Sequence, residues 1–489
     1  MELSKDQGTK GSGGKSLSVT RRDFVKAAAV VPAAGAFYFG YHALQGSPVK
    51  AGIVGTGNEG CEAMIKQSPP EFLEYVAFHD IRPTQIARAR RKFNELYGPQ
   101  QGEAVTFHES WESMLADPNI EAIVIATPLW THAQFAIEAM KAGKHVMCEK
   151  LMAHNITDAK AMVRASEKYN KILSVGHQRH YSTLYDDAME TIRSGKLGDI
   201  RHIRAFWHRN NAQINPDGTI RDSWRPEIPE ADQSVDASKY GYKDISELVR
   251  WRLYDRTGGG LMAELGSHQV DACSLFLAAL AGADGHHEHV RPLAVNGMGG
   301  KWFYEDDRDC DDHIHCLFEF PNGQTVAFTS INTNAMAGYG EEVLGTRGSM
   351  TVMQERELAV FDENDPLKKK REAKKTEMTV DAAKPGEATM YSAASLGLPV
   401  EAAQKSTAKV SRGYKEELEH FAFCIRHPDP ANQVRCDGLV ALHDAVIALS
   451  ANQAIRSGKR LEFQDAWFDP SSPETPDPKP NDMSLASGV

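Results

Sequence analysis

The sequence lacks paired cysteines and an excess of positive charge. Its seven cysteines are scattered without a Cys-x-x-Cys pair, so neither a disulfide framework nor a cysteine-based zinc site is expected. The formal net charge of −11 argues against nucleic acid as a partner, because phosphates attract a basic surface. Hydrophobic residues make up 41% and charged residues 25% of the 489 residues, a mixture typical of soluble globular proteins. This length predicts two or three domains.

The N-terminal 46 residues have the pattern of a twin-arginine export signal and a linker. The residues that match this pattern are Thr20, Arg21, Arg22, Phe24 and Lys26. A weakly apolar run of small residues follows, and beyond it no run of 18 or more apolar residues predicts another membrane span. We therefore expect a periplasmic or otherwise exported protein that touches a membrane only through an uncleaved signal. Since such a location has no nucleotide pool, any dinucleotide there should be tightly bound and recycled.

A glycine-rich turn follows the first apolar strand. The stretch PVKAGIVGTGNEG, residues 48–60, predicts a strand, a turn and the start of a helix. Glycines in this pattern allow a tight turn, close approach of the backbone to a pyrophosphate and close packing of helix on strand. The predicted pyrophosphate-binding residues are Gly55, Thr56, Gly57 and Asn58. The strand and helix on either side make this motif more specific than the glycines alone.

The next predicted strand ends on Asp80, twenty residues after Gly60. A carboxylate at this position can accept hydrogen bonds from the adenosine ribose hydroxyls and would repel a 2′-phosphate, so we expect NAD rather than NADP. Arg82, two residues further on, keeps NADP open as the alternative because it could pair with that phosphate.

Strands and helices continue to alternate up to residue 175. The stretches EAIVIATP, KHVMCEK and KILSVGH predict further strands, so residues 47–175 are expected to form a doubly wound parallel sheet of the Rossmann type. Ligands bind at the carboxyl ends of the strands in such sheets. The residues predicted at this edge to bind the cofactor are Thr127, Pro128, His132, Glu149 and Lys150.

The second half of the chain has a different pattern. Polar and apolar residues alternate along its strands, which predicts an α+β domain over residues 176–465 with an open, mostly antiparallel sheet. Residues 364–413 are rich in Lys, Ala and Glu and predict a mobile surface insertion. The amphipathic helices expected after it precede a Pro/Asp/Ser-rich tail, 466–489, that we expect to be disordered. The cluster of His286, His287 and His289 is expected in a solvated loop, with a metal site as the less favoured alternative.

The stretch TGGGLMAELGSHQVD, residues 257–271, carries the second set of chemical groups. Glu264, His268 and Asp271 are spaced by four and three residues, which places them on one face of a helix. A histidine between two acids suits a general acid/base, because a carboxylate orients the imidazole and shifts its pKa. Two other interpretations stay open: a histidine that only makes core contacts, and a metal site, which lacks a further ligand at a suitable spacing.

Several motifs together resemble the Gfo/Idh/MocA oxidoreductase family. They are GIVGTGNEG, FHDIRP, IATPLWTHAQFAIEAMKAGKHVMCEK, VGHQRHYS, SGKLGDI and GGGLMAELGSHQVD. The resemblance implies a Rossmann domain followed by a domain whose open sheet forms the substrate floor and often an oligomer interface. It places Lys150 beside the nicotinamide and the reacting hydroxyl, and makes His268 the acid/base with Glu264 as its acidic partner.

The resemblance also assigns roles to further residues, and the sequence departs from the family pattern at two positions. Asp271 matches the family's trailing aspartate, and Gln178 and Arg179 match the segment that borders the cofactor and substrate. Leu151 stands where the family has proline, and Glu264 where it usually has aspartate. The residues predicted to line the substrate pocket are Arg179, Trp207, His208, Trp251 and Arg252.

The predicted function is therefore that of an exported NAD-dependent oxidoreductase acting on the secondary alcohol of a sugar or polyol, in a homo-oligomer. One alternative is an NAD-dependent glycosidase or lyase, which oxidises its sugar transiently and so needs no nucleotide supply. The other is a non-catalytic sugar-binding protein on the same fold, against which the intact Lys150 and His268 argue. No metal is expected at the site.

Overall fold

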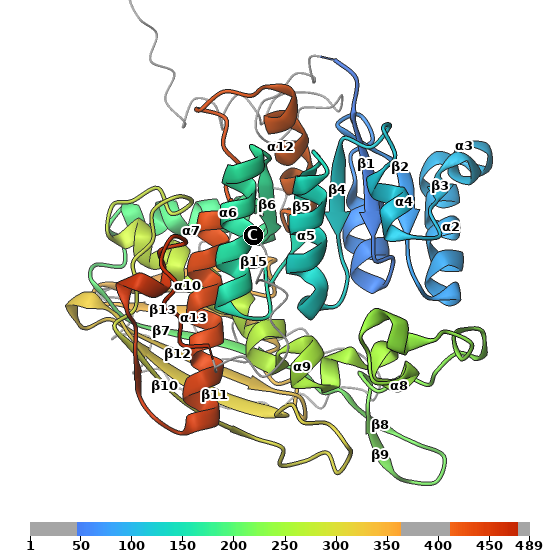
Figure 1. Cartoon of the computed structure of the whole chain (residues 1–489). Coiled ribbons are helices and arrows are strands. Elements are labelled where there is room, and N and C mark those ends of the chain that lie inside the picture. The colour runs from blue at the N-terminus through green and yellow to red at the C-terminus, as the bar shows by residue number, and fades with distance from the viewer. Residues whose placement is uncertain (1–45, 363–410, 478–489) are drawn as a thin grey trace, which may run out of the picture. The chain divides into compact units, whose positions relative to one another are not determined.

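The computed structural model describes residues 46–362 and 411–477, which belong to one compact unit of the chain (Figure 1). The predicted export signal, except its last residue, and residues 364–410 of the predicted insertion lie outside the described residues.

The first sheet is the predicted doubly wound parallel sheet. Its strand order is β3-β2-β1-β4-β5-β6, with β1 at Val49–Val54, β2 at Leu73–His79, β3 at Thr106–Phe107, β4 at Ala122–Ile125, β5 at His145–Glu149 and β6 at Leu173–Gly176. All paired strands run parallel. The strands are nearly continuous apolar runs in the sequence, because helices cover both faces of such a sheet and both faces are buried. These helices are η1 (Glu59–Ile65), α2 (Pro83–Tyr97), α3 (Pro99–Ala104), α4 (Trp111–Leu115), η2 (Leu129–Thr131), α5 (His132–Lys141) and α6 (Ile156–Tyr169).

The second sheet has eight strands in the order β15-β14-β13-β7-β12-β11-β10-β16. The strands are β7 (Ile200–His208), β10 (Ala294–Gly300), β11 (His313–Glu319), β12 (Thr325–Ile331), β13 (Tyr339–Gly345), β14 (Gly348–Met353), β15 (Glu357–Asp362) and β16 (Leu461–Glu462). All pairs are antiparallel except β7 with β12, so the prediction of an open, mostly antiparallel sheet is confirmed. Burial alternates along β12 and β14, which leaves one face open.

Helices cover the packed face of this sheet, as Figure 1 shows for α10 (Ser267–Leu280) and α13 (Gly438–Ser457). We expected α13 to be amphipathic, but it is apolar and buried almost all round because it lies between the second sheet and α6. By length and composition alone α13 could span a membrane, yet 83% of its apolar window is buried inside the protein. It is therefore a core helix.

Shorter elements lie between the strands of the two sheets and after the last strand. They are η3 (Gln178–Tyr181), α7 (Thr183–Arg193), β8 (Ala212–Ile214), β9 (Ile220–Asp222), η4 (Glu230–Asp232), η5 (Ala237–Tyr240), α8 (Ile245–Val249), η6 (Trp251–Leu253), α9 (Asp255–Gly258), η7 (Met262–Gly266), η8 (Pro321–Gly323), α12 (Tyr414–Arg426) and η11 (Asp465–Trp467). Of these, α12 returns to the first sheet and packs against β1, β2 and β6.

Residues 466–477 of the predicted disordered tail are ordered, and residues 478–489 lie outside the described residues. The Lys160 ammonium, on α6, donates hydrogen bonds to the carbonyls of Ala466, Ser472 and Glu474. The Asp477 carboxylate accepts hydrogen bonds from the backbone N–H groups of Ile156 and Thr157, in the first turn of α6. A negative charge at this end of a helix stabilises the helix. Polar composition suggested disorder, but these contacts with α6 order residues 466–477.

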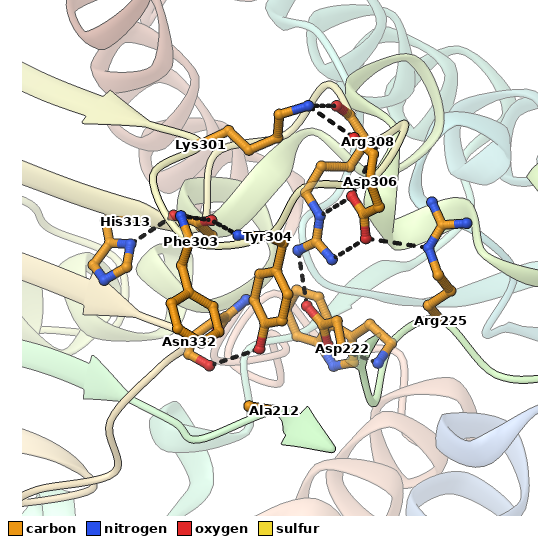
Figure 2. Close-up of polar contacts among 12 residues, drawn as sticks. Ala212, Asp222, Arg225, Lys301, Phe303, Tyr304, Asp306, Arg308, His313 and Asn332 are labelled. Atoms are coloured by element: carbon orange, nitrogen blue, oxygen red, sulfur yellow. Dashed lines mark hydrogen bonds and ion pairs between the residues drawn. The ribbon is translucent and has the colours of Figure 1, made fainter. Parts of the chain in front are cut away.

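The loop between β10 and β11 is held by polar contacts of Asp222, Asp306, Arg308 and Asp312, which we call the loop clamp; Figure 2 labels the first three of these residues. Arg308 is buried and donates to the Asp222 carboxylate at 2.8 Å and to both oxygens of Asp306 at 2.7 Å. The Asp312 carboxylate accepts three successive backbone N–H groups, those of residues 302–304. Each member of the clamp thus has charged or backbone partners, and the clamp joins the β8–β9 ribbon to the second sheet.

Candidate active site

Lys150 and Glu264 meet where the first sheet faces the second half of the chain. Lys150 follows the end of β5, and its Nζ donates a hydrogen bond of 2.7 Å to the backbone carbonyl of Glu264 in η7. The peptide bond between Lys150 and Leu151 is cis. The two motifs, 114 residues apart in the sequence, therefore lie together in the fold.

Glu264 is paired with an arginine rather than with His268. Its carboxylate accepts a hydrogen bond of 2.8 Å from Arg252 Nε. Burial alone raises the pKa of Glu264, but the charges of Arg252 and Lys150 outweigh it and lower the pKa to about 2. We expected Glu264 and His268 to share a helical face. The turn η7 is π-helical, with more residues per turn, so the four-residue spacing does not bring the two side chains together.

His268 lies in the first turn of α10 with its ring beside Trp207, the ring centroids 5.2 Å apart. Its Nδ1 is buried and has no hydrogen-bond partner within the described part of the chain. Burial, together with the positive charges of Lys150 and Arg179, lowers the pKa of His268 well below its ordinary value. The imidazole is therefore neutral and can accept a proton.

Arg179 and Gln178 lie in the protein interior behind His268. The Arg179 guanidinium donates to the His268 backbone carbonyl at 2.6 Å and pairs with Glu341 at 2.8 Å and Glu355 at 3.0 Å. Gln178 donates to the same Glu355 carboxylate. We predicted Arg179 at the substrate; the structure gives it protein partners on these sides, and it holds the start of α10 in place.

The predicted substrate residues divide between the two faces of β7. Trp207 faces His268 and stacks on Tyr339 at 4.3 Å, whereas His208 points to the open face, where it bonds Thr329 and Met336. This division follows from the two-residue period of a strand. The structure thus brings Trp207 to the site but does not bring His208.

The remaining two predicted substrate residues lie together beside Glu264, with the Arg252 guanidinium 4.2 Å from the Trp251 ring centroid. Sequence reasoning missed Arg209. Its guanidinium lies 5.0 Å from the Trp207 ring, and the charge of Glu264 acts on it. The signal was present, because Arg209 is two residues after Trp207 and so shares its face.

The glycine loop has the geometry that a dinucleotide requires. Gly55 has a φ of +85°, and a Cβ at Gly60 would meet the Gly55 carbonyl oxygen at 2.1 Å, so both positions need glycine. A Cβ on Gly57 would have nothing within 4 Å, so the turn is open where a pyrophosphate approaches. Thr56 is buried, and Asn58 accepts a hydrogen bond from Arg88. The loop therefore fits NAD.

Asp80 and Arg82 support the choice of NAD over NADP. The Asp80 carboxylate lies beside the glycine loop and accepts hydrogen bonds from the Thr56 and Arg82 backbone N–H groups at 2.7 and 2.9 Å. The Arg82 side chain, however, pairs with the buried Asp232 at 2.8 Å. A guanidinium engaged by a buried carboxylate is a poor receptor for a 2′-phosphate.

The other residues predicted at the sheet edge have local partners. The buried His132 ring lies between the carbonyls of Thr127 and Leu151, 2.9 Å from each, and so joins the loops after β4 and β5. Pro128 begins the turn η2. Glu149 is buried with one carboxylate oxygen unpartnered among the described residues, and burial, with the charge of Glu59, raises its pKa well above the ordinary value.

Asp271 also departs from its predicted pairing. Its carboxylate contacts His180 at 2.8 Å and His177 at 3.6 Å. His286 and His289, expected in solvent, are instead largely buried; the His286 ring bonds His180 and the His289 ring stacks on His443. The loop folds back onto η3 and α13, which the sequence could not show.

Metal and thiol chemistry have little support in the residues that the structure describes. No group of three or more His, Cys, Asp or Glu side chains there has an arrangement that could hold a metal ion. The seven cysteines are free and buried, so the prediction of structural or free thiols is confirmed.

Two family models match the chain. The model described as "Oxidoreductase family, NAD-binding Rossmann fold" matches residues 49–177, and the model of the GFO/IDH/MocA C-terminal domain matches residues 234–351. The matched segments include the glycine loop and Lys150 on one side, and Glu264, His268 and Asp271 on the other.

Individual relatives are distant. A glycosyl hydrolase family 109 protein from Stenotrophomonas maltophilia is 27% identical over 58% of this chain and 60% of its own length. A 1,5-anhydro-D-fructose reductase from Ensifer adhaerens is 26% identical over 51% and 61%. The chain spans between 50% and 74% of the length of such curated relatives. An inositol dehydrogenase homologue from Azotobacter vinelandii, solved with NADH and myo-inositol, shares the fold with a TM-score of 0.58 at 18% identity, covering 86% of this chain and 98% of that one.

Proposed function

Because the chain belongs to the GFO/IDH/MocA oxidoreductase family, with its NAD-binding Rossmann domain, we propose that it oxidises a secondary alcohol of a sugar or polyol. The observation that carries this proposal is the contact of Lys150 Nζ with the Glu264 carbonyl. This contact, with the effect of the Lys150 charge on His268, supports an ammonium group and a neutral imidazole acting together at the carboxyl edge of the sheet. That is where a parallel sheet of this kind binds its ligand.

Each residue has a definite task in this reaction. His268 accepts the hydroxyl proton through Nε2, because Nδ1 is buried. Lys150 polarises the same oxygen, and the Glu264 carbonyl holds its ammonium in place. The residues that would hold the cofactor are Gly55, Gly57, Asp80 and Glu149, and bound NAD supplies the hydride acceptor.

The substrate class follows from the groups around His268. Trp207 offers an aromatic face, while Arg209 and Arg252 offer hydrogen-bond donors, a combination that suits a hydroxylated ring. The names of relatives agree with this class, since they include a 1,5-anhydro-D-fructose reductase and a scyllo-inositol 2-dehydrogenase.

The test is to incubate the purified protein with a panel of sugars and polyols and to follow NADH absorbance. We expect reduction with at least one compound, and loss of it in the Lys150→Ala variant with NAD binding retained. A sugar that binds without any reduction would contradict the proposal and favour a binding protein.

We further propose that the protein is exported and retains its cofactor. The support is the twin-arginine pattern at Arg21 and Arg22, because a protein exported in this way can carry a cofactor inserted before transport. Mass spectrometry of nucleotide released from the purified protein should give NAD, and fractionation should place the protein outside the cytoplasm. A purified protein free of nucleotide, or one that stays in the cytoplasm, would contradict this part.

A second candidate function is NAD-dependent glycoside cleavage through a transient keto sugar. It is favoured by the similarity to the glycosyl hydrolase family 109 protein and by the export pattern, because the cycle returns its cofactor to the starting state. Release of an aglycone from a glycoside without net NADH would support cleavage. Accumulation of a ketone would support net oxidation.

We also propose a homo-oligomer formed through the open face of the second sheet. Met298 and Leu317 are exposed there, 58% and 42% respectively, on neighbouring strands. Light scattering should give a mass above that of one chain, and the Leu317→Lys variant should lower it. A monomeric wild-type protein would contradict this proposal.

A further inference from the structure

Behind the candidate active site, six side chains form one continuous row. From the inside outward they are Asp444, His177, Asp271, His180, His286 and Asp186, and we call them the buried row. They come from α13, the loop after β6, α10, η3, the loop after α10, and α7. Acids and imidazoles are groups that accept and release protons.

Each interior member of the row presents one atom to each neighbour. His177 lies 3.3 Å from Asp444 through Nε2 and 3.6 Å from Asp271 through Nδ1. The other oxygen of Asp271 is 2.8 Å from His180 Nε2. His180 Nδ1 is in turn 3.2 Å from His286 Nδ1. No side chain has to reorient to touch both neighbours.

The outer end of the row reaches solvent. His286 Nε2 lies 3.5 Å from an oxygen of Asp186, whose side chain is 28% exposed. Arg435 holds this end by donating to the His180 carbonyl and to Asp186. Inward of His286 the members are buried, so the row crosses from the interior to the surface.

The row meets the reacting groups at Asp271. Asp271 is three residues after His268 on α10, and side chains so spaced are neighbours, with Cβ atoms about 5–6 Å apart. The charges of His177 and Asp271 both act on His268, and Asp444 interacts with the charge of Lys150. His268 Nδ1 is buried and has no hydrogen-bond partner among the described residues, so it can bind a bridging water.

We propose that the buried row carries the proton released by alcohol oxidation from His268 to the surface. This inference rests on the proposed function. In that reaction the C–H bond is broken and its hydride reduces NAD, the O–H proton goes to His268 Nε2, and the alcohol carbon becomes a carbonyl. His268 then releases a proton from Nδ1 through one water to Asp271. From there it passes through His180 and His286 to Asp186 and solvent, or rests on His177.

The charges around the row favour this direction. Lys150 and Arg179 disfavour a cationic His268, so it does not retain the proton. The two histidines beside Asp271 lower its pKa well below the ordinary value despite its burial, so its carboxylate does not retain the proton and passes it on to His180. Burial raises the pKa of Asp444 well above its ordinary value, which favours the protonated form of that carboxyl at the inner end of the row.

The experiment separates hydride transfer from proton release. NAD-loaded protein is mixed with an active sugar in weak buffer, with NADH absorbance and a pH-indicator dye recorded together. In the wild-type protein both signals should rise at the same rate. In His286→Ala, NADH should form at the wild-type rate while proton release slows by about 10²-fold, the lower range for a lost proton-transfer group. Added imidazole should restore proton release.

Controls decide what a negative result means. Asp186→Asn changes only the exposed end and should slow proton release in the same way if His286→Ala fails to fold. His108→Gln alters a histidine–aspartate pair in the first domain and should leave both signals unchanged. Synchronous proton release in both row variants would overturn the relay, as would a joint loss of both signals without imidazole rescue. No NADH in the wild-type protein would instead overturn the proposed function and, with it, the proton that the row carries.

Discussion

The loop clamp and the buried row are both sets of buried charges, but they are satisfied to different degrees. In the clamp, Arg308 is neutralised by two carboxylates, and Asp312 accepts three backbone N–H groups (Figure 2). In the row, both nitrogens of His177 and both oxygens of Asp444 lack a hydrogen bond of good geometry among the described residues. Their closest approaches are 3.3 and 3.6 Å.

This difference separates stability from function. Buried polar groups are normally fully hydrogen-bonded, so a closed network holds a loop in one position. A network that leaves hydrogen-bonding capacity unused costs stability, and such exceptions concentrate at functional sites. The row lies behind His268, whereas the clamp fixes a loop of the second sheet. We expect substitutions in the clamp to change the free energy of unfolding and substitutions around His268 to change rates.

The largest effect should come from His268. The His268→Ala variant should lower the rate of hydride transfer by about 10²–10⁴-fold, because a positioned general base contributes that much. NADH affinity, measured by fluorescence titration, should stay unchanged. His202→Ala, on the open face of the second sheet, is the control and should keep full activity. Activity retained in His268→Ala would show that the site is wrongly assigned.

The next effect concerns the clamp. Asp222→Ala should lower the free energy of unfolding by about 3–5 kcal/mol, because it leaves the buried Arg308 charge partly uncompensated. Urea denaturation measures this. The exposed Asp307, a partner of Arg225, offers the control: Asp307→Ala should cost about 0–1 kcal/mol. Equal losses in the free energy of unfolding for the two variants would contradict a stabilising role of the clamp.

Arg209 tests how far the functional region extends. Arg209→Met should raise the KM for the sugar about tenfold with little change in kcat, because a hydrogen bond to a charged group contributes about 1.5–3 kcal/mol. Arg209→Lys should recover part of this loss. A change in kcat alone would place Arg209 among the residues that act on the transition state and not in substrate binding.

The smallest effect is expected at Asp444, where a substitution should raise the free energy of unfolding instead of lowering it. Its pKa in the folded protein is raised by burial, so the unfolded chain loses this proton at lower pH than the folded one. Folding stability therefore declines as pH rises from the unfolded pKa towards the folded one. Asp444→Asn removes this decline and should raise the free energy of unfolding near pH 7, with a smaller gain at pH 4. Urea denaturation at pH 4 and pH 7 measures it; a loss at pH 7 would show that the carboxylate is ionised in the folded protein.

Sequence reasoning succeeded where a local pattern carries the information. The apolar runs and Gly55, Gly57 and Gly60 predict the parallel sheet and its ligand edge, because both follow from neighbours in sequence. Lys150 and His268 were found because family motifs mark them. The missed features depend on distant contacts: the folding of His286 onto His180, and the pairing of Glu264 with Arg252. Arg209 was missed because strand alternation was not extended beyond His208.

Lys160 contacts the other end of the described chain, and this contact also affects the order in which the chain folds. Its ammonium is buried in the first domain, and the three carbonyls that solvate it lie 306 to 314 residues later. During synthesis the N-terminal part of a chain emerges and begins to fold first. Until residues 466–477 have left the ribosome, these carbonyls cannot contact the Lys160 ammonium, so water must solvate it. The first domain can therefore complete its contacts only after the second domain has been synthesised.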